Sequence, residues 1–273
     1  MLYGKKIISV TPSGRKDHLI ILAKYLLDNS NVIDEHHFWV NTTQDEDIEC
    51  IESLCKSHPN FFKAIYLNEE PDGIFTIHKF FKNCCENDTI YIRFDDDICW
   101  IDNNAVSNLI TARINNPNAF LVYANTINHP FCSKIHQELG LMSFDKGRAS
   151  GDGLCDIGWR SGEFGEHVHR VFLEHVKNGN HNEFYFPDVE IPYDCGNRVA
   201  INCICWFGED MADFDGEVGE KEEDWLSIYK PKELKRGLLI SGNSLVAHYA
   251  YFPQRSHIDD TDVLSQYLSV SGA

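Results

Sequence analysis

Short apolar segments alternate with amphipathic segments through the first half of the chain. The apolar segments have the length of β-strands, and the amphipathic segments repeat with the period of an α-helix. We predict strands at 6–10, 37–40, 61–67, 89–94 and 119–123. We predict helices between them at 19–27, 48–55 and 73–85. This alternation is typical of an α/β fold, a doubly wound and mostly parallel sheet flanked by helices.

The pattern changes beyond residue 125. Glycines between 151 and 158 interrupt the chain, and an apolar stripe after Ser161 predicts a helix. We predict strands at 184–186 and 198–207, and a β-hairpin at 238–251 with its turn at 241–243. Because no linker or low-complexity tract separates the two halves, we expect one domain over residues 1–273, with the second half packed as a lobe on the same sheet.

Three consecutive aspartates, Asp95, Asp96 and Asp97, directly follow the predicted strand at 89–94. In an open α/β sheet, ligands bind at the edge formed by the C-terminal ends of the strands. Adjacent carboxylates repel one another unless a cation lies among them, and oxygen ligands suit Mg²⁺ or Mn²⁺. We expect a divalent metal site here. For the tract taken alone, a solvated acidic turn is the alternative interpretation.

The charge balance limits the partners of the protein. With 42 acidic and 24 basic residues, the formal net charge is −18. Such a charge repels the phosphates of nucleic acids and the surface of anionic membranes, so we expect no nucleic-acid partner. It also repels a nucleoside diphosphate. A protein this acidic that binds one therefore needs a metal ion and a few well-placed arginines near the phosphates.

The cysteines and the apolar segments bear on location. Ten cysteines are scattered along the chain without a CxxC pair, a pattern that indicates free thiols in a reducing compartment. The first six residues lead into a strand pattern and not into a signal sequence. No apolar segment approaches the roughly 20 residues of a membrane span. We therefore expect no membrane span and a cytoplasmic protein.

Three other segments carry residues suited to ligand contacts. Residues 11–15 connect a strand to a helix as a phosphate-facing turn does, although an ordinary turn has the same composition. Glu223 and Asp224 belong to an acidic run ahead of an apolar helical turn, where a plain charged helix start is the alternative. His248 lies in a predicted strand, where a histidine is often a core residue.

Taken together, these segments resemble the nucleotide-sugar-dependent glycosyltransferases of the GT-A fold, in particular family 2-like members with a DxD motif. The segments that carry the resemblance are 11–15, 39–42, 91–97, 223–225 and 248–249. The resemblance extends over most of the chain. It implies a GT-A type fold in which residues 1–125 bind the nucleotide-sugar donor and residues 126–273 bind the acceptor.

The resemblance also implies a metal and a donor site. Asp95 to Asp97 match the DxD motif, which holds Mn²⁺ or Mg²⁺ on the donor diphosphate and contacts the ribose. His248 matches a late histidine that completes the metal shell, so Asp95, Asp97 and His248 are the expected metal ligands. The expected donor-binding residues are Thr11, Ser13, Arg15, Asn41, Arg93, Asp95 and Asp96.

The implied activity is metal-dependent transfer of a sugar from a nucleotide-sugar to a glycan or another hydroxyl acceptor. A cation stabilises the departing nucleoside diphosphate, and a carboxylate removes the proton of the attacking hydroxyl. Glu223 or Asp224 matches the base of inverting members, with Asp224 slightly favoured. Inversion is favoured over retention, although retaining members also carry a late histidine. The alternatives are a non-catalytic nucleotide-sugar-binding protein and a DxD-type phosphotransferase.

Overall fold

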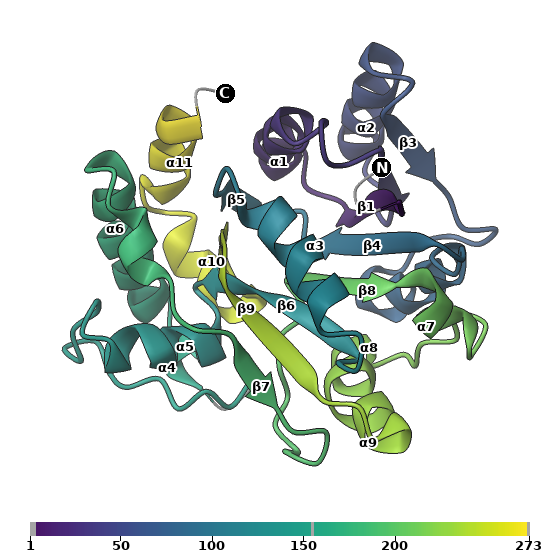
Figure 1. Cartoon of the computed structure of the whole chain (residues 1–273). Helices are drawn as coiled ribbons and strands as arrows, with labels where there is room; N and C mark the ends of the chain where they lie inside the picture. The colour runs from purple at the N-terminus through teal and green to yellow at the C-terminus, as the bar shows by residue number, and fades with distance from the viewer. Residues whose placement is uncertain (1–3, 154–155, 272–273) are drawn as a thin grey trace.

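The computed structural model describes residues 4–153 and 156–271. These residues form one sheet, whose strands are β1 Lys6–Ser13, β2 Glu35–Val40, β3 Phe62–Ile65, β4 Thr89–Phe94, β5 Ile98–Ile101, β6 Leu121–Ile127, β7 Val189–Ile191, β8 Cys203–Phe207 and β9 Leu238–His248. The strand order is β3-β2-β1-β4-β8-β6-β9-β5, and β7 pairs with β9 (Figure 1).

The longer helices are α1 Lys16–Asp28, α2 Asp45–Ser57, α3 Ala105–Asn115, α4 Pro130–Glu138, α6 Gly162–Lys177, α10 Phe252–Ile258 and α11 Val263–Ser271. The shorter helices are α5 Ile157–Arg160, α7 Gly208–Ala212, α8 Glu222–Asp224 and α9 Lys230–Leu234. The 3₁₀ segments are η1 Gly73–Phe75, η2 Ile77–Asn83 and η3 His181–Phe184, and η4 Trp225–Tyr229 is a π-helical turn. No helix within the described ranges is long and apolar enough to cross a membrane.

The first half of the sheet is parallel, as the alternation of strands and helices predicts. β1 lies between β2 and β4, and β3 extends the sheet beyond β2, all in parallel. β8 then enters antiparallel between β4 and β6, while β6 and β9 run parallel to each other. Because β8 is antiparallel to both β4 and β6, β6 runs parallel to β4. The ends of β1, β4 and β9 therefore point toward the same edge of the sheet.

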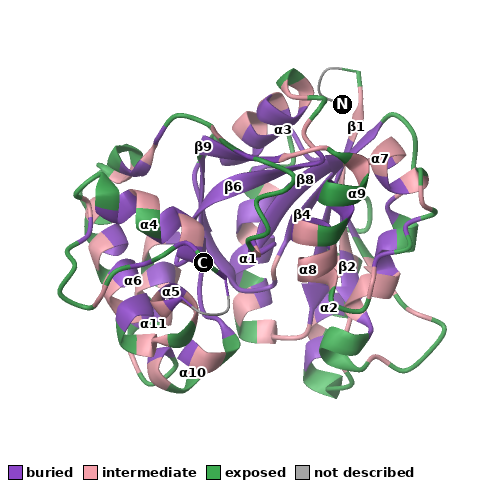
Figure 2. Ribbon diagram, turned by 90° about the horizontal axis from the view of Figure 1, so that it is seen from below, coloured by how far each residue is buried: buried purple, intermediate pink, exposed green. Residues whose placement is uncertain are grey.

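The core lies on both faces of this sheet. One apolar cluster packs α1, α3, α6 and α11 against one face, and a second packs η2, α4, α7 and η4 against the other. Every residue of β4 is buried, which explains the apolar and aromatic residues at 90–92 and at 94. The buried Arg93 between them is paired with Asp95 and Glu222. Figure 2 shows the buried strands enclosed by helices whose outer faces are exposed. The side chain of Ser161 caps the predicted helix α6 by accepting a hydrogen bond from the Phe164 amide at 3.2 Å.

The predicted hairpin at 238–251 is wrong. β9 is one strand that pairs with β6 on both sides of residues 242–244. The register moves from Ala124 opposite Ser241 to Asn125 opposite Leu245, so the glycine-containing segment forms a bulge and not a turn. The Asn125 side chain stabilises this bulge by donating a hydrogen bond to the Gly242 carbonyl at 2.9 Å.

Two other predictions need correction. The segment 73–85 forms two 3₁₀ helices, since the Thr76 hydroxyl bonds to the Asn41 side chain and to the Asp72 amide where a regular helix would continue. Phe80 is buried as expected, but Ile74 is 71% exposed. The segment 184–186 begins with the last residue of η3 and is not a strand.

The bulge generates a test of stability. A Cβ atom at Gly242 would lie 1.8 Å from the Phe186 carbonyl oxygen, too close for any rotamer adjustment to relieve. Gly242→Ala should therefore lower the free energy of unfolding by about 3 kcal/mol or more, measured by urea denaturation. Gly179→Ala is the control, because that glycine has φ +73° but no atom near its Cβ position, and it should cost about 1 kcal/mol. Equal losses in both variants would contradict the steric explanation.

Candidate active site

A cleft of about 440 Å³ lies at the edge of the sheet where β1, β4 and β9 end. Ser13 from β1, the three aspartates that follow β4, and His248 from β9 all line it. Residues far apart in sequence meet here because parallel strands end at a common edge. The prediction that ligand-binding residues gather at this edge thus has a physical basis in the strand order.

Asp95 is fixed in place by two neighbours. Its carboxylate accepts hydrogen bonds from the Arg93 guanidinium and from the Asn202 side chain, each at 2.9 Å. The Asn202 oxygen in turn accepts a hydrogen bond from the Tyr251 hydroxyl at 2.7 Å. Burial raises the pKa of Asp95, and the charge of Arg93 opposes this shift. The result is a carboxylate of defined orientation that lines the cleft.

Arg15 links the other two aspartates. This residue stands just before α1 and bonds to Asp96 through Nε at 3.1 Å and to Asp97 through Nη1 at 3.0 Å. The backbone amide of Gly14 also donates to Asp96 at 3.2 Å. Although burial disfavours the guanidinium charge, the carboxylates of Asp97 and Asp96 raise the pKa of Arg15. Asp96 therefore faces the β1–α1 loop.

Asp95, Asp97 and His248 form a group suited to a divalent cation. Each offers one ligand atom, and these atoms lie within 4.8 Å of one another. Nε2 of His248 is 3.3 Å from Oδ1 of Asp97, and this oxygen is buried without a hydrogen-bond partner in the described part of the chain. Burial opposes ionisation, yet Arg15 and His248 hold the pKa of Asp97 well below its usual value. Two carboxylate oxygens and one imidazole nitrogen fit Mn²⁺ or Mg²⁺.

The structure places most of the predicted donor-binding residues in the cleft. Ser13, Arg15, Asn41 and Arg93 line it together with Asp95 and Asp96. Thr11 does not line the cleft, because it is buried inside β1. Asn41 is held at the rim, where its amide donates to the Gly73 carbonyl at 3.0 Å. The roles of these residues in donor binding stay predictions.

The acidic run at α8 reaches the cleft through two of its three members. Glu222 and Glu223 line the cleft, and Asp224 does not. Glu223 is bonded to the Arg198 guanidinium at 2.8 Å, and Asp224 lies 3.3 Å from the same group. Burial raises the pKa of Glu223, while Arg198 opposes the shift. Of the two candidate bases, Glu223 is the one that lines the cleft, and the role of either acid as base stays a prediction.

Arg255 lines the cleft but is not among the residues predicted from the sequence. It lies on α10 and forms no ion pair with any acid of the described residues. Its Nε atom is buried without an acceptor in the described part of the molecule. Burial lowers the pKa of Arg255, and the nearby charge of Arg15 adds to this effect. No motif surrounds Arg255, so nothing in the sequence marked it as different from other arginines.

A scan against protein-family models and a search of the curated proteins found no match. Among solved structures, the chain is similar to mannosyltransferase PcManGT from Pyrobaculum calidifontis in complex with GDP-Man and Mn²⁺, with a TM-score of 0.55 and 9% identity over 99% of this chain and 64% of that one. It is also similar to GalNAc-T7 with UDP, GalNAc and Mn²⁺, with a TM-score of 0.55 and 11% identity over 100% of this chain and 48% of that one.

The chain has the GT-A fold. A third structure, a mycobacterial protein, matches with a TM-score of 0.51 and 10% identity over 98% of this chain and 76% of that one. Identities this low establish the fold alone, and the fold predicted from the sequence is confirmed. The chain spans between about half and two thirds of the length of the two named glycosyltransferases.

The geometry of the aspartates predicts which of them bind metal. Asp97→Asn should weaken Mn²⁺ binding about 100-fold or more, because it removes a charged ligand. Asp96→Asn should change Mn²⁺ affinity by less than about threefold, since Asp96 lies outside the ligand group and contacts Arg15 and Gly14. Electron paramagnetic resonance of free Mn²⁺ during titration measures both. Equal losses in the two variants would assign the cation to the whole acidic tract.

A pair of histidine variants supplies the matched control for this assignment. His248→Ala should weaken Mn²⁺ binding with little change in melting temperature. His136 is equally buried but hydrogen-bonds to Asn125 in the core, so His136→Ala should lower the melting temperature and leave Mn²⁺ affinity unchanged. If His248→Ala behaved like the core variant, His248 would be a structural residue.

Proposed function

We propose that this protein is a metal-dependent glycosyltransferase that moves a sugar from a nucleotide-sugar donor to a hydroxyl acceptor such as a glycan. The observation that carries the proposal is the group of Asp95, Asp97 and His248 at the ligand-binding edge of a GT-A fold, with Glu223 lining the same cleft. The mannosyltransferase and GalNAc-T7 structures contain Mn²⁺ together with a nucleotide or nucleotide-sugar, which supports this metal and this class of donor.

On the donor side, the cleft must accept a diphosphate despite the acidity of the protein. Asp95, Asp97 and His248 hold the divalent cation, which when bound supplies Lewis-acid stabilisation of the departing diphosphate. Arg255 donates charge-assisted hydrogen bonds to the phosphates. Among the described cations that line the cleft, Arg15 and Arg93 are already paired with acids, whereas Arg255 is not.

On the acceptor side, Glu223 acts as the base. Its carboxylate lines the cleft, and the hydrogen bond from Arg198 fixes its orientation. It removes the proton of the acceptor hydroxyl as that oxygen attacks the anomeric carbon. Attack from the face opposite the departing diphosphate inverts the configuration. Trp159 and the 82% exposed Phe252 line the same cleft and offer apolar surfaces to the sugar rings.

We also propose that the chain works as one domain in a reducing compartment such as the cytoplasm. Strands from both halves of the chain share one sheet, which supports a single domain. The nine cysteines within the described ranges are all free thiols. Five of these nine are buried, three are half-buried, and one, Cys195, is exposed. Cys155 lies outside the described residues.

The proposed activity is tested with a panel of UDP-, GDP-, dTDP- and CMP-sugars, each with and without Mn²⁺. At least one should raise the melting temperature only when Mn²⁺ is present, because a ligand bound by the folded state alone stabilises it. Transfer to an acceptor or slow hydrolysis of that donor should follow. Stabilisation without Mn²⁺ and without turnover would identify a non-catalytic binding protein. Phosphate release from simple phosphoesters would instead indicate a phosphotransferase.

The assignment of the base gives a sharper prediction. Glu223→Gln should lower turnover by about 100-fold or more while donor affinity survives, since the lost contact acts mainly in the transition state. Asp224→Asn is the matched control and should retain most of the activity, because Asp224 does not line the cleft. NMR of the product gives an independent check: retention of the donor's anomeric configuration would rule out single displacement and remove the base role of Glu223.

A further inference from the structure

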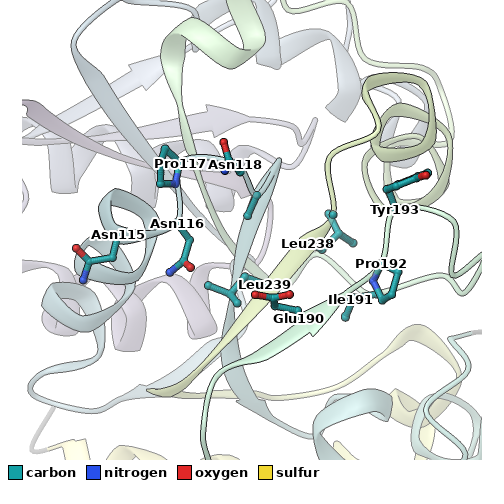
Figure 3. Close-up of a pocket in the computed structure, with 12 residues that line it drawn as sticks. Asn115, Asn116, Pro117, Asn118, Glu190, Ile191, Pro192, Tyr193, Leu238 and Leu239 are labelled. Carbon is teal, nitrogen blue, oxygen red and sulfur yellow. The ribbon is translucent and has the colours of Figure 1, made fainter.

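A second hollow of about 420 Å³ lies at the opposite edge of the sheet from the aspartates (Figure 3). It is bounded by the loop 115–119, by β7 with the residues that follow it, and by the start of β9. β6 and β9 begin at this hollow, whereas the aspartates follow the end of β4, which runs parallel to β6. A ligand bound here therefore occupies a place separate from the candidate active site.

The side chains that line the hollow suit hydroxyl groups. Asn115, Asn116 and Asn118 lie on one side, and Pro192 and Tyr193 lie on the other (Figure 3). An amide both donates and accepts hydrogen bonds, as a sugar hydroxyl does. The Asn116 amide donates to the Ala112 carbonyl at 2.9 Å. The amides of Asn115 and Asn118 are exposed and have no hydrogen-bond partner among the described residues, so they are available to a ligand.

Apolar surface accompanies these amides. Tyr193 is 40% exposed, and two prolines, Pro117 and Pro192, lie at the same hollow. Leu238 and Leu239 also border the hollow, although their side chains are buried in the two core clusters. A pyranose ring presents C–H groups on its faces and hydroxyls around its edge. A hollow with an aromatic ring and several amides matches both kinds of surface.

One arginine holds the amide-bearing loop in shape. Arg236 donates hydrogen bonds to the carbonyls of Pro117 at 3.1 Å, Asn118 at 3.3 Å and Ala119 at 2.9 Å. Its guanidinium is itself bound to Asp210 at 2.6 Å. Three carbonyls of the loop are therefore bonded within the protein, while the side-chain amides of Asn115 and Asn118 are left for a ligand. A loop that is ordered in advance loses less entropy when a ligand binds.

A second arginine and a glycine complete this support. Arg113 is fully buried and donates to the carbonyls of Phe120, at 3.2 Å, and of Asn116. Gly237 lets the start of β9 approach the chain after β7, because a Cβ atom there would lie 2.7 Å from the Ile191 carbonyl oxygen. Both sides of the hollow are thus fixed relative to the sheet.

The charge of the lining selects the class of ligand. Of the twelve described residues that line the hollow, none is basic and one, Glu190, is acidic. With a net charge of −18, the protein repels phosphates and sulfated or uronic sugars from such a surface. We propose that this hollow is a binding site for a neutral oligosaccharide, separate from the donor and acceptor sites of the cleft.

Saturation-transfer difference NMR and titration with four neutral probes test the site: mannotriose, cellotriose, xylotriose and chitotriose. At least one should bind, and binding should persist in Asp97→Ala and in the presence of Mn²⁺ with saturating nucleoside diphosphate. The double variant Asn118→Ala with Tyr193→Ala should weaken binding about tenfold or more. The matched control combines Asn103→Ala with Tyr229→Ala, two exposed positions outside the hollow, and should bind as the wild type does.

Three results would overturn the proposal. The first is that none of the four trisaccharides binds. The second is that Asp97→Ala or the nucleotide abolishes the signal, which would place the sugar in the cleft. The third is that the double variant in the hollow binds as well as its control. Trigalacturonic acid, which carries carboxylates, should not bind, and tight binding of this probe would contradict the selection for neutral ligands.

Discussion

The architecture of the cleft depends on the neutralisation of two acidic runs. Three carboxylates follow β4, three more belong to α8, and the whole protein already carries an excess of negative charge. Carboxylates gathered in a partly buried place repel one another strongly unless cations lie between them. The pairs are Arg15 with Asp96 and Asp97, Arg93 with Asp95 and Glu222, and Arg198 with Glu223 and Asp224. The bonds of Arg15 connect the β1–α1 loop to the segment that follows β4. The bonds of Arg93 and Arg198 connect β4 and the segment before β8 to α8.

Much of the fold was predictable because its signals are local. β4 is buried on both faces, so its apolar run is read directly from the sequence. Ser161 marks the start of α6 because a hydroxyl at that position satisfies a free amide of the first turn. The metal group was also predictable in outline, since Asp95 and Asp97 follow a strand whose end lies at the ligand-binding edge.

Long-range packing decided what the sequence alone did not. Ser241, Gly242 and Asn243 have the composition of a turn, but hydrogen bonds from β6 and contact with Phe186 keep this segment within one strand. Whether Glu223 or Asp224 faces the cleft depends on the orientation of α8 and of the π-helical turn η4 that follows it. Adjacent acids look equivalent in a sequence, and only the fold gives them different surroundings.

The pairing of acids with arginines leaves a few polar groups of the cleft without partners. Five atoms are buried and make no hydrogen bond within the described part of the chain: Oδ1 of Asp97, Oε2 of Glu222, Nδ1 of His248, Nε of Arg93 and Nε of Arg255. A buried polar group without a partner costs about 1–3 kcal/mol. In the cleft this cost falls on two carboxylate oxygens and three nitrogen atoms. A cation bound by Oδ1 of Asp97 and Nε2 of His248, with an anion on that cation and on Arg255, gives partners to two of these atoms, Oδ1 of Asp97 and Nε of Arg255. A metal-bound diphosphate is a ligand of this kind.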